Sequence, residues 1–224
     1  MKAIRIHEYG GLEVLRYEEV PIPKPEEGEV LVRVHAAGVN PSDAKIREGK
    51  AFASMYEDPF PFIPGWDVSG VVCELGSGVT NFKEGDPVYG MVNFPYEGGG
   101  YAEYVTAPAF HLAPKPASLD HVQAAALPLA ALTVWQSLFD AAGLRKGDKV
   151  LVHAAAGGVG HLAIQLARWK GASHIIGTAA ANDEGYLKTI GVDEVIDYMK
   201  VNFEDVVKDV DVVLDCMGGE VQER

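Results

Sequence analysis

The chain has 224 residues, of which 48% are hydrophobic and 23% are charged, and its formal net charge is −13. A chain of this length can bury a sizeable core and forms one or two domains. Nucleic acids and anionic membrane surfaces attract clusters of lysine and arginine, and the sequence contains no such cluster. We therefore expect neither a nucleic acid nor a membrane as a partner.

Two cysteines, Cys73 and Cys216, are too few for a disulfide framework or a four-cysteine metal site. We expect both to be small core residues in a protein of the reducing cytosol. The first residues include no apolar segment of signal-peptide length, and the longest apolar stretch, 124–135, is too short to cross a bilayer. These features predict a cytoplasmic location.

Short strands separated by turns are predicted in the first half of the chain. Apolar runs bounded by Gly, Pro and Asp lie at residues 12–20, 30–39, 68–75, 87–92 and 101–107. The second run alternates apolar and polar positions, which is typical of a half-buried strand. This spacing predicts a β-rich domain, a barrel or a sandwich, over residues 1–117.

The pattern changes at about residue 118, where a helical stretch rich in Ala and Leu runs to residue 142. Strands are then expected at 149–153, 174–177, 194–197 and 211–215, alternating with helices at 159–170, 183–190 and 203–208. This alternation predicts an α/β domain over residues 118–224, built on a doubly wound parallel sheet.

The predicted sheet is incomplete. A full dinucleotide-binding fold has six strands in the order 3-2-1-4-5-6, and the sequence stops shortly after the fourth. Residues 210–214 would then form an exposed edge strand, and such an edge invites pairing with another chain. We expect a fragment, a processed form or a protein that needs a partner to cover this edge.

A glycine turn connects the first of these strands to its helix. Gly157 allows a close backbone approach to a pyrophosphate, and Gly160 allows the helix to pack tightly on the strand. Gly158 and Val159 lie between them, and Ala155 replaces the usual first glycine. An ordinary tight turn is the alternative, but the strand before the turn and the helix after it favour a dinucleotide phosphate site.

Six segments together resemble the zinc-independent branch of the medium-chain dehydrogenase/reductase superfamily, the quinone oxidoreductase or zeta-crystallin-like proteins. They are Gly-Val-Asn-Pro-Ser-Asp at 38–43, Ile-Pro-Gly-Trp-Asp-Val-Ser-Gly at 63–70, Gly-Asp-Pro-Val-Tyr-Gly at 85–90, Gly-Tyr-Ala-Glu-Tyr at 100–104, Leu-Pro-Leu-Ala-Ala-Leu-Thr at 127–133 and Ala-Ala-Ala-Gly-Gly-Val-Gly at 154–160. The resemblance implies a GroES-like N-terminal domain and a partial Rossmann domain.

The resemblance also bears on zinc. Zinc-dependent relatives carry metal ligands where this sequence has Asn40, Trp66 with Asp67, and Leu129. Trp and Leu side chains cannot bind zinc, and the four-cysteine structural-zinc loop has no counterpart. We therefore expect no metal.

By resemblance, the expected reaction is hydride transfer from NADPH to a quinone or an α,β-unsaturated carbonyl. Asn40 is expected to donate a hydrogen bond to the oxygen that gains charge or to the nicotinamide ribose, or else it satisfies a local turn. Asp43 and Lys45 either orient the ribose or relay a proton, or they are a solvated helix-start Asp and an exposed Lys. Tyr56 and Tyr101 either line an acceptor pocket or serve packing.

Several residues are candidates for the cofactor site. Thr133 resembles a cofactor-contacting threonine of the family, or it caps a helix. No acidic residue ends the second predicted strand, and Asp183 fits a helix start better, so a ribose 2′-phosphate has room. Thr178, Asn182 and Tyr198 are expected to contact that phosphate. The loop contains no Lys or Arg, the nearest later cation being Lys188, but the pattern favours NADP(H).

Two other functions fit the same sequence. One is a catalytically silent NADPH-binding or structural protein, or an inactive fragment. The other is an alcohol or enoyl-type reductase on the same scaffold, because a fold does not determine a substrate. A homo-oligomer is expected for the full-length form.

Overall fold

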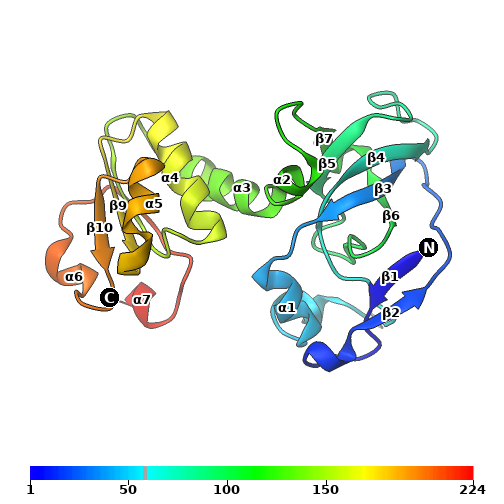
Figure 1. Ribbon diagram of the computed structural model, residues 1–224, viewed down its shortest axis with the longest axis horizontal. Helices are drawn as coiled ribbons and strands as arrows, with labels where there is room; N and C mark the ends of the chain where they lie inside the picture. Colours follow the sequence, from blue (N-terminus) through cyan, green and yellow to red (C-terminus); the bar gives the residue numbers. More distant parts are fainter. Residues whose placement is uncertain (58–59, 224) are drawn as a thin grey trace. The chain divides into compact units, whose positions relative to one another are not determined.

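The computed structural model describes residues 1–57 and 60–223, without the side chain of Phe52. The chain forms two units, Met1–Leu129 and Ala130–Arg224. Most helices and strands of both units are labelled in Figure 1.

A five-stranded antiparallel sheet in the order β6-β3-β4-β5-β7 forms the body of the first unit. Its strands are β3 (Glu29–Ala37), β4 (Asp67–Leu75), β5 (Pro87–Met91), β6 (Tyr104–Pro108) and β7 (Leu112–Pro114), and a 3-10 turn, Ala109–His111, precedes β7. The register of β3 against β4 shifts twice, which indicates bulges. Valines of β3, β4 and β5, among them Val30, Val68 and Val88, are fully buried in one core. The prediction of a β-rich first domain is confirmed.

A second group of elements precedes and follows β3. It comprises β1 (Lys2–Arg5), which pairs with β2 (Arg16–Glu19), the 3-10 turns Leu12–Val14 and Ala51–Met55, and α1 (Pro41–Arg47). Ile6, Ile46, Phe62 and Trp66 form their shared buried core.

Three details of the predicted elements are wrong. Residues 12–20 are not one strand, because the Glu13 carboxylate accepts the Gly11 N–H at 2.8 Å and supports a turn there. The strand predicted at 101–107 begins only at Tyr104, because the Tyr101 N–H is already bonded to the Pro64 carbonyl at 2.9 Å. The helical stretch 118–142 is divided into α2 (His121–Ala125), α3 (Pro128–Trp135) and a π-helical segment, Gln136–Ala141.

Pro128 explains the division between α2 and α3. A proline lacks the N–H that a helix interior needs and is favoured at a helix start. α2 packs against β3, β4 and β5. The predicted domain boundary after residue 117 therefore lies before a helix that belongs to the first unit.

The second unit is built on a four-stranded parallel sheet in the order β10-β9-β8-β11. Its strands are β8 (Lys149–Val152), β9 (His174–Ala179), β10 (Glu194–Asp197) and β11 (Val212–Leu214). The helices are α4 (Gly158–Lys170), α5 (Glu184–Thr189) after the 3-10 turn Ala181–Asp183, α6 (Phe203–Val206) and α7 (Glu220–Glu223). Numbered along the chain, the order is 3-2-1-4, which confirms the doubly wound sheet. In the described part of the chain β11 is an edge strand, and its Val213 is 51% exposed.

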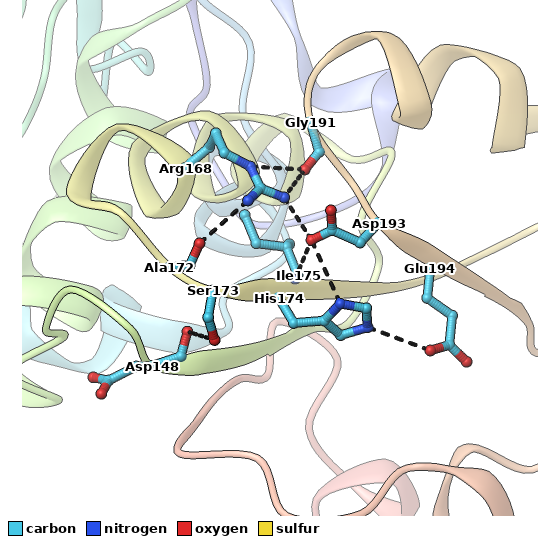
Figure 2. A network of polar contacts seen from close by, with 9 residues as sticks. All are labelled: Asp148, Arg168, Ala172, Ser173, His174, Ile175, Gly191, Asp193 and Glu194. Atoms are coloured by element: carbon cyan, nitrogen blue, oxygen red, sulfur yellow. Dashed lines mark hydrogen bonds and ion pairs between the residues drawn. The ribbon is translucent and has the colours of Figure 1, made fainter.

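A polar network fastens the end of α4 to the sheet (Figure 2). The Arg168 guanidinium donates to the carbonyls of Gly191 at 2.8 Å and Ala172 at 3.2 Å, and it forms an ion pair with Asp193. Asp193 also accepts the Ile175 N–H at 2.7 Å. Burial acts to raise the pKa of Asp193, but the hydrogen bonds from Ile175 and Arg168 outweigh it and hold the pKa below its usual value.

Two further expectations can be compared with the structure. Cys73 is half-buried and Cys216 is exposed, so the prediction that both are core residues is wrong. Cys216 lies outside the helices and strands, after β11. Within residues 1–57 and 60–223, every helix is too short or too polar to span a bilayer.

The start of α4 lies very close to the turn that follows β8. A Cβ atom added at Gly160 would lie 2.3 Å from the Ala154 carbonyl oxygen and 2.7 Å from that of Ala155. Both neighbours are backbone atoms, so the helix itself would have to move. A Cβ at Gly158, two residues earlier in the same helix, would meet no atom within 4 Å.

We expect Gly160→Ala to lower the free energy of unfolding by about 1–3 kcal/mol, because overpacking against a fixed backbone cannot relax cheaply. Urea unfolding followed by circular dichroism measures the change. Gly158→Ala is the matched control and is expected to change it by less than about 1 kcal/mol. Equal effects of the two substitutions would contradict the close approach.

Candidate functional site

The turn after β8 has the geometry expected of a phosphate-binding turn. Gly157 caps α4 in an extended conformation, with φ −75° and ψ 173°. Ala154 adopts a φ of 50°, which is uncommon outside glycine. The first N–H groups of α4, from Gly158, Val159 and Gly160, have no acceptor within the helix. They and the helix dipole favour an anion at this point.

Ala155 lies beneath this turn and is fully buried. Its backbone N–H donates to the Thr178 carbonyl of the neighbouring strand at 3.0 Å. A Cβ at Gly177 would lie 2.8 Å from the Ala155 Cβ, so the alanine that replaces the usual first glycine fits because β9 has a glycine opposite it.

A cavity of about 360 Å³ opens beside the turn. Its lining includes three of the predicted cofactor residues: Gly157, Thr178 and Tyr198. The remaining lining residues are mostly apolar: His153, Ala154, Ala156, Ala179, Ala180, Asp183, Phe203, Met217 and Val221. A lining that includes residues of the glycine turn and many apolar side chains suits a ligand with both a phosphate and a ring system.

Six predicted cofactor residues do not line this cavity, and four of them, Ala155, Gly158, Val159 and Gly160, belong to the turn and the start of α4 beside it. Asn182 is exposed in the 3-10 turn before α5, and Thr133 lies in α3. Asp183, which does line the cavity, occupies the N-cap position of α5, as the sequence indicated, but its side chain makes no capping hydrogen bond. The lining contains no Lys or Arg, and Lys188 is bonded to Glu184 at 2.5 Å.

His153 is a cavity residue that the sequence analysis did not single out. It follows β8, is 3% exposed, and its Nδ1 lies 3.1 Å from the Thr178 hydroxyl. Its ring packs edge-on against that of Phe203, with centroids 4.5 Å apart. A polar residue directly after the apolar run Val150–Val152, at the carboxyl end of the strand, was the signal that could have identified it.

In the first unit, Asn40 connects two buried carboxylates. Its backbone N–H donates to Asp43 Oδ2 at 2.7 Å, and its side-chain Nδ2 donates to Asp67 Oδ2 at 3.0 Å. The Tyr101 hydroxyl donates to Asp43 Oδ2 at 2.9 Å, and the Leu129 N–H donates to Asp67 Oδ1 at 2.9 Å. The structure therefore brings Asn40, Asp43 and Tyr101 together and adds Asp67.

Asp43 is 5% exposed, so the alternative of a solvated helix start is wrong. It is the third residue of α1 and forms a capping box with Asn40 at the helix start. Burial raises the pKa of Asp43, although the hydrogen bonds from Asn40 and Tyr101 oppose the rise. Its Oδ1 is buried and has no hydrogen-bond partner among the described residues.

Asp67 is the most buried carboxylate of the group, at 1% exposure. Desolvation raises its pKa to about 6, against hydrogen bonds from Asn40 and Leu129, and the charge of Asp43 adds to the rise. The same burial, together with the Asp43 carboxylate, raises the pKa of the Tyr101 hydroxyl.

The two other candidates of this unit lie apart from the hydrogen-bonded group. Lys45 is exposed on α1, and its side chain has no hydrogen bond to the described residues. Tyr56 donates to the Pro95 carbonyl, and its ring packs against that of Phe62, with centroids 5.6 Å apart.

The positions at which zinc-dependent relatives carry ligands hold no metal-binding set. Trp66 is 1% exposed and its indole N–H donates to the Tyr96 carbonyl at 2.8 Å. Leu129 donates its backbone N–H to Asp67, and its side chain has no donor atom for a metal. Across the described ranges, no three His, Cys, Asp or Glu side chains are grouped so as to hold a metal ion.

Two families match successive parts of the chain. Residues 26–117 match the alcohol dehydrogenase GroES-like domain, and residues 158–224 match the family described as zinc-binding dehydrogenase.

Individual relatives match almost the whole chain. The NADPH-dependent alkenal/one oxidoreductase of Arabidopsis thaliana is 42% identical over 97% of this chain and 58% of its own length. The quinone oxidoreductase structure from Coxiella burnetii is 43% identical with a TM-score of 0.93, covering 99% of this chain and 70% of that one. The Escherichia coli quinone oxidoreductase complexed with NADPH is 33% identical with a TM-score of 0.88, covering 100% of this chain and 68% of that one.

The chain spans about three fifths of the length of the curated relatives it matches, 57% for a tomato reductase and 61% for a spinach relative. The identity to the Coxiella burnetii protein, over more than two thirds of that chain, shows the family. The chain belongs to the quinone oxidoreductase, zeta-crystallin-like group of the medium-chain dehydrogenase/reductase superfamily.

Proposed function

We propose that the protein is a zinc-independent oxidoreductase that transfers hydride from NADPH to a quinone or an α,β-unsaturated carbonyl. The observation that supports this most directly is the glycine turn at the start of α4 beside the 360 Å³ cavity. Relatives named as quinone and NADPH-dependent alkenal/one oxidoreductases support the choice of reaction. Zinc independence rests on Trp66 and Leu129, whose side chains have no donor atom for the metal.

The second unit would hold the cofactor. The backbone N–H groups of Gly158, Val159 and Gly160 would bind the pyrophosphate, with Gly157 and Ala155 shaping the turn. Thr178, Asn182 and Tyr198 would bind the 2′-phosphate through neutral donors, since no cation lines the cavity. Thr133 would contact the cofactor as well. When bound, NADPH supplies the hydride.

The first unit would provide the polar groups that act on the acceptor. A carbonyl that receives hydride at a conjugated carbon gains negative charge on its oxygen, and a fixed N–H donor stabilises that charge. Asn40 would be this donor. Asp43 accepts a hydrogen bond from the Asn40 backbone N–H, and the Tyr101 hydroxyl in turn donates to Asp43. Lys45 would contact the ribose, and Tyr56 would contact the acceptor.

A cytoplasmic location and a homo-oligomeric full-length form stay predictions. The Arabidopsis thaliana and spinach relatives are named as chloroplastic, so relatives of this chain are not confined to one compartment.

The test of the proposed reaction is NADPH oxidation in the presence of a panel of quinones and enones. We expect Asn40→Ala to lower kcat by about 100-fold, which is the effect of removing one oxyanion donor. NADPH affinity, measured by nicotinamide fluorescence, is expected to change little. Asp120→Ala removes the helix cap of α2 instead and is expected to keep kcat. Turnover that requires added zinc would overturn the proposal.

Cofactor preference is tested at Tyr198, which is 59% exposed and lines the cavity. We expect Tyr198→Phe to weaken NADPH binding by about tenfold, the effect of one hydrogen bond to a charged group, and to leave NADH binding unchanged. Tyr186→Phe, on α5 and outside the cavity lining, is the matched control. A Tyr198→Phe protein that loses affinity for NADH to the same degree would contradict a contact to the 2′-phosphate.

A further inference from the structure

The side-chain amide of Asn40 is held by a hydrogen bond at one of its ends and faces the start of α1 with the other. Its Nδ2 donates to Asp67 Oδ2 at 3.0 Å, and the capping-box arrangement turns the same side chain toward the backbone nitrogen of Asp43, which donates to the Asn40 main-chain carbonyl at 3.0 Å. An amide has two N–H donors and one acceptor oxygen. With one N–H directed to Asp67 and the oxygen directed to the helix start, one N–H is left for a ligand.

The charge of Asp67 decides which end of the amide faces it. An ionised carboxylate only accepts hydrogen bonds, so Nδ2 must point toward it. A protonated carboxyl can also donate, and the amide oxygen can then take that place. The turned amide would direct its N–H groups toward the Asp43 backbone N–H. Because both groups are donors, they cannot form a hydrogen bond with each other.

Asp67 is itself fixed by backbone from two other segments. The Leu129 N–H lies 2.9 Å from its Oδ1 and 3.2 Å from its Oδ2. The Gly38 N–H donates to the Asp67 carbonyl at 2.8 Å. The carboxylate thus joins the start of β4, the start of α1 and the first turn of α3, which are the segments that carry zinc ligands in other relatives.

The groups that face Asp67 are few. The charge of Asp43, on α1, helps to raise the pKa of Asp67. The charge of Asp67 in turn helps to raise the pKa of Tyr101, which precedes β6. Neither Asp43 nor Asp67 forms an ion pair with any residue in the described ranges. Nothing cationic therefore holds Asp67 in its ionised form, and its charge depends on the donors from Asn40 and Leu129.

We propose that Asp67 is a positioning residue for the reaction, which fixes the Asn40 amide with one N–H directed at the substrate oxygen or the cofactor ribose. This rests on the proposed function of Asn40, but the hold on the amide is a separate property of the free protein. The Asp67 carboxylate must lose a proton to act, and with its pKa raised to about 6 it does so in the neutral range. Acidification through pH 6 releases the amide.

The direct test is an NMR pH titration of the Asn40 side-chain amide in the full chain without cofactor. The resonance pair is assigned by its loss in Asn40→Ala. In the unaltered protein it is expected to shift with a midpoint near pH 6, and Asp67→Asn is expected to abolish that midpoint. Glu74→Gln, an exposed carboxylate on the same strand, is the matched control and is expected to leave it unchanged.

A second variant covers the case in which Asp67→Asn does not fold. Asp43→Asn removes the neighbouring negative charge that raises the pKa of Asp67. We expect it to move the Asn40 midpoint to lower pH. A midpoint that is unaffected by Asp43→Asn, or an Asn40 amide that titrates in Asp67→Asn as it does without the substitution, would overturn the proposal.

Kinetics separate this inference from the proposed function. Asp67→Asn is expected to lower kcat at pH 8 by about tenfold, with little change in KM, and to flatten the acid limb of the pH profile. In an Asn40→Ala background the same substitution should change kcat by less than about twofold, since residues that act through one another are not additive. A full tenfold loss in that background would overturn the positioning role. If Asn40→Ala leaves kcat unchanged, the proposed function of Asn40 fails while the titration still decides whether Asp67 holds the amide.

Discussion

The first unit depends on a carboxylate that is removed from water. Asp67 is 1% exposed, and a buried carboxylate is tolerated only where donors surround it. Its donors come from Asn40 and Leu129, so both segments must approach β4 closely. Gly38 permits this, because a Cβ there would lie 2.5 Å from the Ala125 carbonyl and 2.8 Å from the Asp67 Cβ. One glycine and one buried charge together fix where α1 begins.

In the second unit, the polar groups that are held in a fixed orientation are backbone N–H groups alone. α4 approaches the turn after β8 so closely that only glycine fits at position 160, and β9 has Gly177 where Ala155 packs against it. These contacts leave the first N–H groups of the helix directed away from the strand and available to an anion. In each unit, therefore, close backbone packing fixes the orientation of the polar groups. A change of side-chain rotamer does not alter that packing.

The sequence predicted the second unit better than the first. The strands predicted at 149–153 and 174–177 have the continuous apolar centres Val150–Val152 and Ile175–Ile176, which is the pattern of a parallel strand buried on both faces. In the first unit, β1 has only four residues and β7 only three, so no window of either is long enough to show a period. Leu12–Val14 has the composition of a strand and forms a turn because of a single side-chain contact from Glu13.

The candidate sites were predictable to the extent that local pattern determines them. The turn at 157–160 is local, and its geometry follows from spacing between a strand and a helix. Asp67 lies 27 positions from Asn40 and 62 from Leu129, and nothing in the spacing of the sequence connects them. The resemblance identified these three positions as lost zinc ligands, and only the structure places them in one hydrogen-bonded group.

The residues that line the cavity determine how a doubly charged phosphate would be held. On the proposed function, the 2′-phosphate meets Thr178, Asn182 and Tyr198 but no cation among the residues that line the cavity, and Asp183 contributes a negative charge to the lining. Hydrogen bonds from neutral donors are short-ranged and depend on geometry, whereas ion pairs act over distance and weaken with salt. The hydroxyl of Thr178 is already oriented by buried His153, at 3.1 Å. Discrimination between the two nicotinamide cofactors would then come from the fixed direction of a few donors, and it should respond to ionic strength less than in a site built on lysine or arginine.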